Sequence, residues 1–380
     1  MEKKVIIVRY SEIHLKGRNK YIFINQLRNN IINALSDYNC EVKFESNRYI
    51  IQDIKKEEIK DIKTNLKKIF GIHSFSEAIA IDTSLEKIIE YIRGFKLSEN
   101  TKSFAISVNR ADKKFELSSP ELEKQLGSII YENHENIDVD LENPDEKIYL
   151  DIRESKVTYI YSNVIRGFGG MPVGSSGKAL ALLSGGIDSP VAMFGISNRG
   201  MQTDAIYFHT YPYTSEQAKQ KVLDLAKIIK PYTGLRKVFV VPFTYLQEEI
   251  NRAANPEFSI ALMRRYMVRI AEKISNKHNY KALVTGENLA QVASQTIESL
   301  TSTQSALQSE LLILRPLISS TKEDIIKKAK QIGTYSTSIL PYEDCCTIFL
   351  PKNPIIKPKL KKVRIEESKL SGMDDLIQDA

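Results

Sequence analysis

The stretch ALLSGGIDSPVAMF, from Ala181 to Phe194, decides the fold of the half of the chain that surrounds it. An apolar run ending at Leu183 predicts a buried strand, and Pro190 suits the first turn of a helix because its missing N–H needs no partner there. Between them, Gly185 and Gly186 permit a tight backbone that a ligand can approach closely. The pattern therefore predicts a strand, a tight loop and the N-terminus of a helix.

Strands alternate with helices in the sequence after this stretch. The segments KALALLS, QTDAIYFHT, RKVFVVPF and KALVTGE predict strands, and the segments between them predict helices. Repeated β-then-α segments indicate a doubly wound parallel sheet, which we place in residues 166–380. In such a sheet the loop lies at the carboxyl end of a strand, where ligands bind.

The N-terminal part of the chain predicts two small α+β domains. In residues 1–76, a strand in KVIIV and a hairpin in EVKFESNRYIIQD flank a helix that begins at Lys20 and ends at Leu35. In residues 77–165, helices and a strand precede a hairpin in KIYLDIRESKVTYIYSNV. A glycine-rich stretch, RGFGGMPVGSSGKA, follows as a linker or a binding loop. We expect three domains, with boundaries after residues 76 and 165.

The composition is that of an ordinary globular protein, with 42% hydrophobic and 27% charged residues. No apolar run approaches the roughly 20 residues of a membrane span, and the N-terminus lacks the apolar region of a signal peptide. Three cysteines are too few for a disulfide framework, so we expect a cytoplasmic protein with reduced thiols. The net charge of +7 fits a polyanion partner and equally fits a lysine-rich composition.

The Ser-Gly-Gly-x-Asp-Ser loop has the chemistry of an anion site. Backbone N–H groups of the loop and the helix N-terminus attract phosphate, and Ser184 and Ser189 add hydroxyl donors. The loop matches neither the Walker A pattern nor G-x-G-x-x-G, and a structural turn with capping residues is the alternative. Asp188 is either a helix cap or a residue that orders Mg²⁺ and hydrogen-bond donors at a phosphate. We favour the phosphate site and the second role for Asp188.

At these residues the chain resembles a known superfamily. LLSGGIDSPVA is similar to the PP-loop of the ATP pyrophosphatases, which adenylate an oxygen and then displace AMP with nitrogen or sulfur. Nearly the whole chain resembles the tRNA 4-thiouridine synthetases, or tRNA sulfurtransferases, through VRYSEIHLKGRN, GGMPVGSSGKALALLSGGIDSPVA, MRRYMVRIAEKI, VTGENLAQVASQT, LRPLISSTKEDI and PYEDCC, in that order. The resemblance implies a ferredoxin-like domain, an RNA-binding THUMP domain and a PP-loop domain. The chain ends at Ala380, so we expect a short form without a rhodanese domain.

The resemblance also implies a site for ATP and Mg²⁺. The matching nucleotide positions are Leu182, Leu183, Ser184, Gly185, Gly186, Asp188, Ser189, Tyr207, Phe208, Arg264, Gly286 and Gln295. The strand-end positions among them are core residues by pattern alone, and their backbones would line the adenine pocket. Arg264 and Arg265 cannot share one helix face, and the resemblance selects Arg264. Gly286 would allow close approach to the adenine or ribose, and Gln295 offers an amide. We assign no metal-ligand residues, because the histidines are scattered.

Lys322 lies at a predicted helix start, capped by Ser320 or Thr321. A cation there opposes the helix dipole, and an anion bound at that end would remove the conflict. A solvated surface lysine is the alternative. The resemblance implies a lysine that is needed for adenylation, and we favour that role.

The three cysteines divide into one core candidate and one adjacent pair. Cys40 lies beside a predicted strand and is more typical of a core. Cys345 and Cys346 follow PYED, and no second pair is present for a zinc site. The resemblance favours Cys346 as the carrier of a persulfide. In the alternative, both cysteines pack and sulfur arrives as free sulfide or on the persulfide of a partner.

Together these features predict an ATP-dependent tRNA sulfurtransferase that converts uridine to 4-thiouridine, at position 8 by resemblance. The predicted catalytic residues are Asp188, Lys322 and Cys346. The alternatives are another PP-loop enzyme, such as an amidating ligase or a 2-thiouridylase, and a non-catalytic tRNA-binding module.

The expected partners are tRNA and a cysteine desulfurase that donates the persulfide, with no membrane contact. A thiamine sulfur-carrier protein, a role in supplying sulfur to the thiazole of thiamine, and a homodimer stay open. Basic residues of the first two domains are candidates for a face that tracks phosphates, without individual assignment: Lys16, Arg18, Lys20, Arg28, Arg48, Lys102, Arg110, Lys113 and Lys114.

Overall fold

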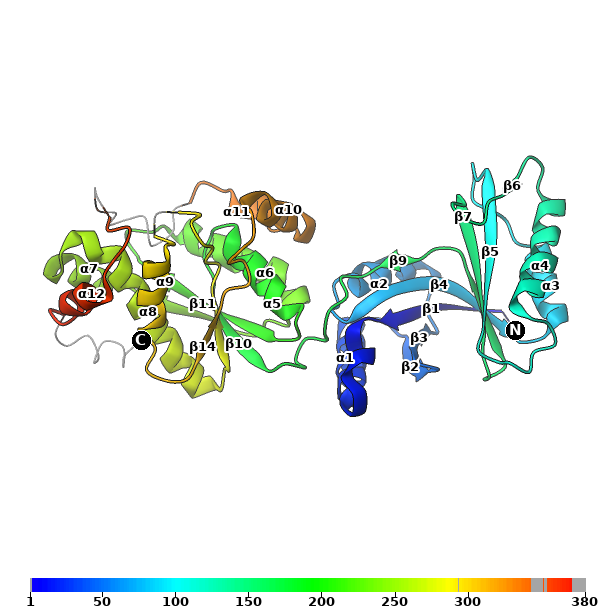
Figure 1. Cartoon of the computed structure of the whole chain (residues 1–380), viewed down its shortest axis with the longest axis horizontal. Coiled ribbons are helices and arrows are strands. Elements are labelled where there is room, and N and C mark those ends of the chain that lie inside the picture. The colour runs from blue at the N-terminus through cyan, green and yellow to red at the C-terminus, as the bar shows by residue number, and fades with distance from the viewer. Residues whose placement is uncertain (1, 293, 343–350, 352–353, 371–380) are drawn as a thin grey trace. The chain divides into compact units, whose positions relative to one another are not determined.

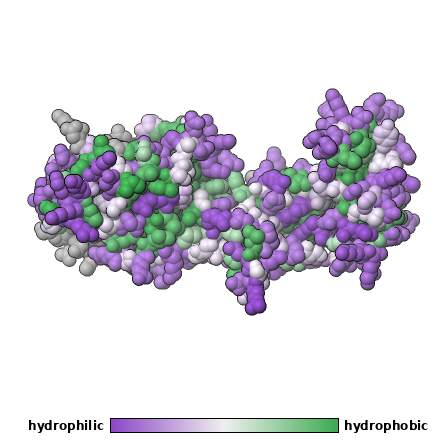
Figure 2. Space-filling view, in the orientation of Figure 1, coloured by the Kyte–Doolittle hydropathy of each residue, from purple (hydrophilic) through white to green (hydrophobic). Residues whose placement is uncertain are grey.

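A computed structural model describes residues 2–292, 294–342, 351 and 354–370 of the chain. The chain divides into two compact units, Met1–Gly170 and Met171–Ala380. Polar and charged side chains predominate on the visible face of each unit, with apolar patches among them (Figure 2). Within the described residues, the helices are too short or too polar to span a membrane.

One mixed sheet forms the frame of the first unit (Figure 1). Among the described residues its strand order is β2-β3-β1-β4-β8-β7-β5-β6, and β9 pairs with β4. The strands are β1 Lys3–Tyr10, β2 Glu41–Glu45, β3 Arg48–Gln52, β4 Ile72–Asp82, β5 Ser103–Arg110, β6 Asp138–Val139, β7 Glu146–Ile152, β8 Val157–Tyr161 and β9 Ile165–Arg166.

Strand β4 joins the two α+β halves of this unit. It pairs antiparallel with β1 along most of its length and with β8 at its end, where Ile79 lies opposite Ile160. The boundary that we expect after residue 76 therefore falls inside a continuous strand, and the division into separate domains there stays a prediction.

Four α-helices pack on one face of this sheet and bury two apolar clusters. Helices α1 (Lys20–Ala34) and α2 (Ile59–Leu66) cover a cluster that includes Ile6, Leu27 and Phe75. Helices α3 (Leu85–Arg93) and α4 (Ser119–Asn133) cover a cluster that includes Phe104, Leu122 and Ile148. Helix α4 begins with a capping box between Ser118 and Glu121, as its Ser-Ser-Pro start predicts. The short 3₁₀ helices η1 and η2 span Glu12–Asn19 and Lys56–Glu58.

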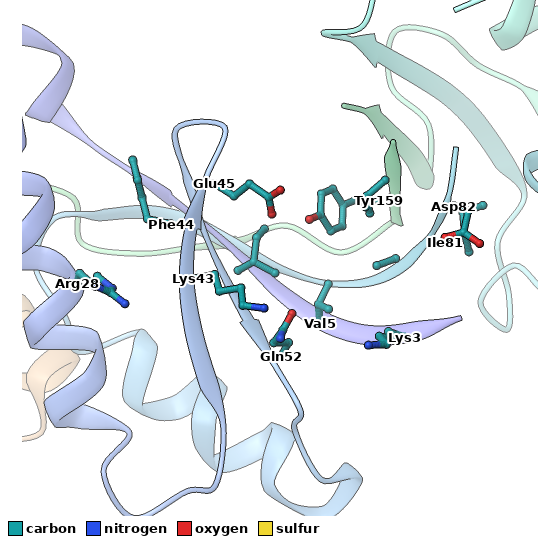
Figure 3. A pocket seen from close by; sticks show the side chains of 13 residues that line it. Lys3, Val5, Arg28, Lys43, Phe44, Glu45, Gln52, Ile81, Asp82 and Tyr159 are labelled. Carbon is teal, nitrogen blue, oxygen red and sulfur yellow. The ribbon is translucent and has the colours of Figure 1, made fainter. Parts of the chain in front are cut away.

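The opposite face of the sheet holds a cavity and an ionic cluster. The cavity has a volume of about 640 Å³, and in Figure 3 Glu45 and Tyr159 face each other across it. Elsewhere on this unit Asp151, 1% exposed, accepts a hydrogen bond of 2.6 Å from Arg153 and contacts Arg48. Burial, together with the neighbouring Arg153 and Arg9, lowers the pKa of Arg48 to about 10. These ions are buried and hold parts of the fold together.

The second unit contains a parallel sheet with the strand order β12-β11-β10-β13-β14 among the described residues. The strands are β10 Lys178–Leu182, β11 Gln202–His209, β12 Val238–Pro242, β13 Ala282–Val284 and β14 Leu312–Leu314. The chain winds outward from β10 in one direction and then returns to β13 on the other side. The strand order therefore reverses between β10 and β13, which is where open parallel sheets bind ligands.

Helices cover both faces of this sheet (Figure 1), which confirms the predicted doubly wound fold. Helices α5, α6, α10 and α11 pack together, and so do α7, α8, α9 and α12. Their bounds are α5 Asp188–Ser197, α6 Glu216–Thr233, α7 Thr244–Ala253, η3 Pro256–Phe258, α8 Ser259–His278, α9 Ile297–Gln304, α10 Lys322–Ile332, α11 Tyr335–Ser338 and α12 Leu360–Glu367.

Candidate active site

The glycine loop joins β10 to α5, as the sequence predicts. Hydrogen bonds close it on itself: the Ser184 N–H donates to Oγ of Ser189 at 3.0 Å, and the Gly186 N–H donates to Oγ of Ser184 at 3.2 Å. Ser338 of α11 donates to the Gly186 carbonyl at 3.3 Å. These bonds fix a short loop at the N-terminus of α5, which is the arrangement that binds phosphate in other α/β proteins.

Asp188 is the first residue of α5, and its carboxylate binds side chains from distant segments. Lys322 donates to Oδ1 at 2.7 Å, and Gln291 donates to Oδ2 at 2.9 Å. Ile187, and not Asp188, occupies the N-cap position of α5. The side chains of Asp188 and Lys322 are 24% and 43% exposed, so a ligand can reach both. The fold thus brings together two of the three predicted catalytic residues and gives Asp188 partners other than a helix cap.

Lys322 begins helix α10, whose N-cap is Thr321. The Thr321 hydroxyl accepts a hydrogen bond from the Asp324 N–H at 3.2 Å. A cation in the first turn of a helix is unfavourable unless a negative group lies close by. The carboxylate of Asp188 is such a group, and it holds the ammonium at the edge of the phosphate loop.

Gly286 follows β13 and packs directly against the start of α5. A Cβ at this position would lie 2.9 Å from the Ser189 nitrogen and 3.0 Å from the Asp188 carbonyl carbon. The close approach that this glycine allows is therefore to the backbone of the phosphate loop. Its predicted approach to the nucleotide stays a prediction.

Arg264 and Arg265 lie on different sides of α8, as expected. Arg265, 2% exposed, pairs with Glu367 of α12 at 2.8 Å and is a core residue. Arg264 is 3.2 Å from Glu287, one position beyond Gly286, so it lies beside the carboxyl end of β13. The resemblance selected the arginine that faces the candidate site.

Gln291 and Gln295 lie in the loop that follows β13. The Gln295 carbonyl accepts a hydrogen bond from the Ala290 N–H at 2.9 Å, which tightens the loop. Within the described residues, the side-chain carbonyl oxygens of both glutamines are buried and have no hydrogen-bond partner. Buried acceptors of this kind are rare and indicate an unoccupied binding role.

The remaining nucleotide positions lie at the ends of adjacent strands. Leu182 pairs with Ile206, and the Leu183 N–H donates to the Ile206 carbonyl at 2.9 Å. Tyr207 and Phe208 are 2% and 5% exposed. Their side chains belong to the core, so only backbone groups at these positions can meet a nucleotide.

Sequence reasoning missed Gln291 and an ionic network around Glu287. Glu287, 8% exposed, accepts hydrogen bonds from Arg315 at 2.8 Å and from Thr285 at 3.0 Å in addition to its pair with Arg264. Arg315 follows β14, so this carboxylate ties together the strand ends on one side of the reversal point. Only Gln291 carried a local signal, because it lies four residues before Gln295 in the same polar loop.

The predicted sulfur carrier lies outside the described residues, as do Cys345 and Cys346 together. The last described residue before them is Tyr342, whose carbonyl accepts a hydrogen bond from Lys221 of α6 at 3.5 Å. Cys40 packs against the core of the first unit, and burial raises the pKa of its thiol. Cys40 is therefore a core residue, as expected.

His209 ends β11 and is 3.4 Å from Thr214 through Nδ1 and 3.4 Å from Glu216 through Nε2. A hydrogen bond from Lys219, and to a smaller degree the contact with His209, lowers the pKa of Glu216. Among the described residues, no group of three or more histidine, cysteine, aspartate or glutamate side chains is arranged to hold a metal.

Three family models match the chain. Residues 174–371 match the thiamine biosynthesis protein ThiI, residues 5–76 match the ThiI ferredoxin-like domain, and residues 82–162 match the THUMP domain.

Solved and curated relatives agree with these matches. A probable tRNA sulfurtransferase of Alkaliphilus oremlandii is 45% identical over 97% of this chain and 94% of its own length. One from Staphylococcus epidermidis is 43% identical over 100% of this chain and 93% of its own length. The structure of a 4-thiouridine synthetase–RNA complex with bound ATP is similar with a TM-score of 0.90 and 35% identity, over 99% of this chain and 97% of that chain. The chain belongs to the ThiI family of tRNA sulfurtransferases.

Proposed function

We propose that this protein binds ATP at the loop between β10 and α5 and uses it to convert uridine at position 8 of tRNA into 4-thiouridine. The observation that carries the proposal is the contact of 2.7 Å between Asp188 and Lys322 at the N-terminus of α5. A carboxylate and an ammonium that meet beside a phosphate loop suit the transfer of an adenylyl group, where charge develops on phosphate oxygens.

The site has separate places for the parts of ATP. The loop N–H groups and the start of α5 suit the phosphates, and the backbones at Leu182, Leu183, Tyr207 and Phe208 suit the adenine. Arg264 and Gln295 flank the other side of the crevice, beyond β13. The bound ATP in the similar 4-thiouridine synthetase supports this assignment.

The residues at this edge also suit a magnesium ion. Mg²⁺ prefers oxygen ligands and is usually held by one or two carboxylates together with substrate phosphates. The Asp188 carboxylate is partly exposed, and the partnerless Gln291 side-chain oxygen is buried beside it. When bound, Mg²⁺ would neutralise phosphate charge, with Asp188 as its protein ligand and Gln291 orienting that carboxylate.

The proposed reaction has two steps. Uracil O4 attacks the α-phosphorus of ATP, an O4–P bond forms, and pyrophosphate leaves; Lys322 stabilises the negative charge that develops during this step. The outer sulfur of a persulfide on Cys346 then attacks C4, the C4–O4 bond breaks, and AMP departs with O4. A second thiol cleaves the remaining S–S bond and releases 4-thiouridine.

The proposed domains 1–76 and 77–165 bind the tRNA, and 166–380 performs the chemistry. The persulfide donor that we propose is a cysteine desulfurase. The ThiI family model, described as a thiamine biosynthesis protein, supports a second proposal: transfer of sulfur to a thiamine sulfur-carrier protein for the thiazole ring.

Product mapping tests the function. Purified protein, ATP, tRNA, cysteine and a cysteine desulfurase should yield tRNA with a single sulfur, at C4 of uridine 8 by mass spectrometry. Sulfur at C2 of a uridine would identify a 2-thiouridylase instead. Absence of both sulfur and pyrophosphate release, with tRNA still bound, would identify a binding module.

The cysteine assignment has its own test. Cys346→Ser should abolish thiolation driven by the desulfurase and leave pyrophosphate release intact, whereas Cys345→Ser should change little. Normal thiolation by Cys346→Ser, with the desulfurase as sole sulfur donor, would remove the carrier role.

A further inference from the structure

A row of aromatic rings runs from the core of the second unit to its surface. Tyr207, His209 and Tyr211 occupy alternate positions at and just beyond the end of β11, so their side chains project to the same side. The ring centroids are 5.9 Å apart from Tyr207 to His209 and 6.4 Å apart from His209 to Tyr211, with tilts of 38° and 32°. Exposure rises along the row from 2% through 9% to 63%. We call these three residues the ring row.

The backbone that carries the outer end of the ring row is fixed. The Thr244 hydroxyl donates to the Tyr211 carbonyl at 2.7 Å, and the Phe243 N–H donates to the His209 carbonyl at 2.8 Å. Both donors belong to the turn between β12 and α7. An exposed ring on an anchored backbone loses little conformational freedom when it binds a ligand, which favours affinity.

The ring row lies at the edge of the sheet where the phosphate loop begins. Strand β11 is the parallel neighbour of β10, and the last paired residues are Leu182 and Ile206. From Leu183 onward the chain of β10 turns into the loop, while β11 continues to His209. The rings therefore line the side of the candidate site that the predicted nucleotide residues beyond β13 do not occupy.

We propose that the ring row is the platform on which the target uracil stacks, with Tyr211 as the ring that contacts the base. Enzymes that act on a base first remove it from its stack, and proteins hold unstacked RNA bases against aromatic side chains. The row supplies such a surface beside the site of adenylation, and a single exposed ring matches the area of one base. The inference rests on the proposed function, because it places the uracil that reacts.

Photocrosslinking tests the contact directly. The product base, 4-thiouracil, absorbs at longer wavelength than ordinary bases and reacts with groups that touch it. Full-length protein bound to 4-thiouridine tRNA and irradiated in that band should crosslink within residues 210–214, as located by mass spectrometry. Tyr211→Leu should lose most of this crosslink. A crosslink that maps to another segment, and is unchanged in Tyr211→Leu, would overturn the proposal.

Kinetics of the same variants supply the second readout. Tyr211→Leu should lower kcat/KM for tRNA-dependent pyrophosphate release about tenfold or more, because the stacking ring is lost. Tyr211→Phe should restore the rate to within about twofold, since it keeps the ring. The affinities for ATP and tRNA should not change, which shows that the variant is folded. Tyr245→Leu, at a tyrosine 58% exposed on α7, is the matched control and should behave as wild type.

Two further outcomes separate this inference from its rivals. If Tyr211→Leu releases pyrophosphate normally but fails only when the desulfurase supplies sulfur, Tyr211 binds a protein partner and the stacking role is wrong. If the wild-type protein releases no pyrophosphate with tRNA, the proposed function itself fails. Normal release by wild type and by Tyr211→Leu alike would overturn the stacking role and leave the proposed function standing.

Discussion

Asp188 is held by two side chains that lie 103 and 134 positions away in the sequence, Gln291 and Lys322. Each donates to a different carboxylate oxygen, so the orientation of the carboxylate is set before any ligand binds. Preorganised charges stabilise a transition state without a reorganisation cost at the moment of reaction. At the scale of single residues, the account therefore depends on this three-residue contact.

Neutralising either charge should slow adenylation. Asp188→Asn and Lys322→Ala should each lower tRNA-dependent pyrophosphate release a hundredfold or more, equivalent to at least ~2.7 kcal/mol of barrier. Both side chains are partly exposed, so urea unfolding should be close to that of wild type. Lys327→Ala, an exposed lysine of the same helix α10, is the control and should retain full release. A near-wild-type rate in Asp188→Asn or Lys322→Ala would remove that residue from the mechanism.

Gln291 should act through Asp188. Gln291→Leu removes the hydrogen bond to Oδ2, and we expect a loss of about tenfold in rate, or ~1.4 kcal/mol. The Mg²⁺ concentration for half-maximal rate should rise as well, because the carboxylate is no longer oriented. Titration of pyrophosphate release with Mg²⁺ checks this. An unchanged Mg²⁺ profile would show that Gln291 has only a packing role.

At the scale of elements, the contact between β13 and α5 sets the position of the phosphate loop. Gly286→Ala would place a methyl group within 2.9 Å of the α5 backbone, so the two elements must separate. We expect a loss of about 1–3 kcal/mol in the free energy of unfolding and weaker ATP binding. Gly127→Ala is the matched control, since a Cβ at this position in α4 meets nothing within 4 Å and should be neutral or stabilising. Equal behaviour of the two variants in urea unfolding would contradict the packing argument.

Local pattern was sufficient for most elements, and it failed where distant contacts decide. The alternation in β1 and the caps of α4 could be read from neighbouring residues. Gly71 was expected to cap α2, but the helix ends at Leu66, and Gly71 precedes β4 with φ 96° and donates to the Gly169 carbonyl at 2.7 Å. A partner almost a hundred residues away requires that conformation, and no short window of sequence contains it.

The candidate site shows the same division. The phosphate loop could be predicted because its residues are consecutive and their chemistry is local. The roles of Gln291, Glu287 and Arg315 could not, because each depends on a partner brought close by the order of the strands. The resemblance supplied Arg264 and Gln295, which spacing alone would not have selected.

At the scale of the whole molecule, tRNA binding should be electrostatic and should depend on the first unit. The structure removes two candidates from the predicted phosphate-tracking set. Arg48 contacts Asp151, and Arg110 donates to the carbonyls of Phe115 and Leu117 at 2.9 and 2.6 Å. Lys113 and Lys114 follow them in an exposed loop and remain available.

Replacing Lys113 and Lys114 together by alanine should weaken tRNA binding at low salt and reduce the slope of log affinity against log salt by up to about two. Filter binding over a salt series measures both quantities. Lys227→Ala, at an exposed lysine of α6 that pairs with Asp224, serves as the control and should leave the slope unchanged. If the double variant keeps the wild-type slope, these lysines make no phosphate contacts.

The central claim is that uracil O4 attacks the α-phosphorus of ATP, and the fate of that oxygen tests it most directly. tRNA carrying ¹⁸O at O4 of uridine 8 is incubated with the protein, ATP and the sulfur donor, and the AMP released is examined by mass spectrometry. The account predicts one ¹⁸O atom in each AMP formed with 4-thiouridine, because the C4–O4 bond breaks and the O4–P bond remains. AMP without ¹⁸O, alongside normal formation of 4-thiouridine, would contradict adenylation of the base.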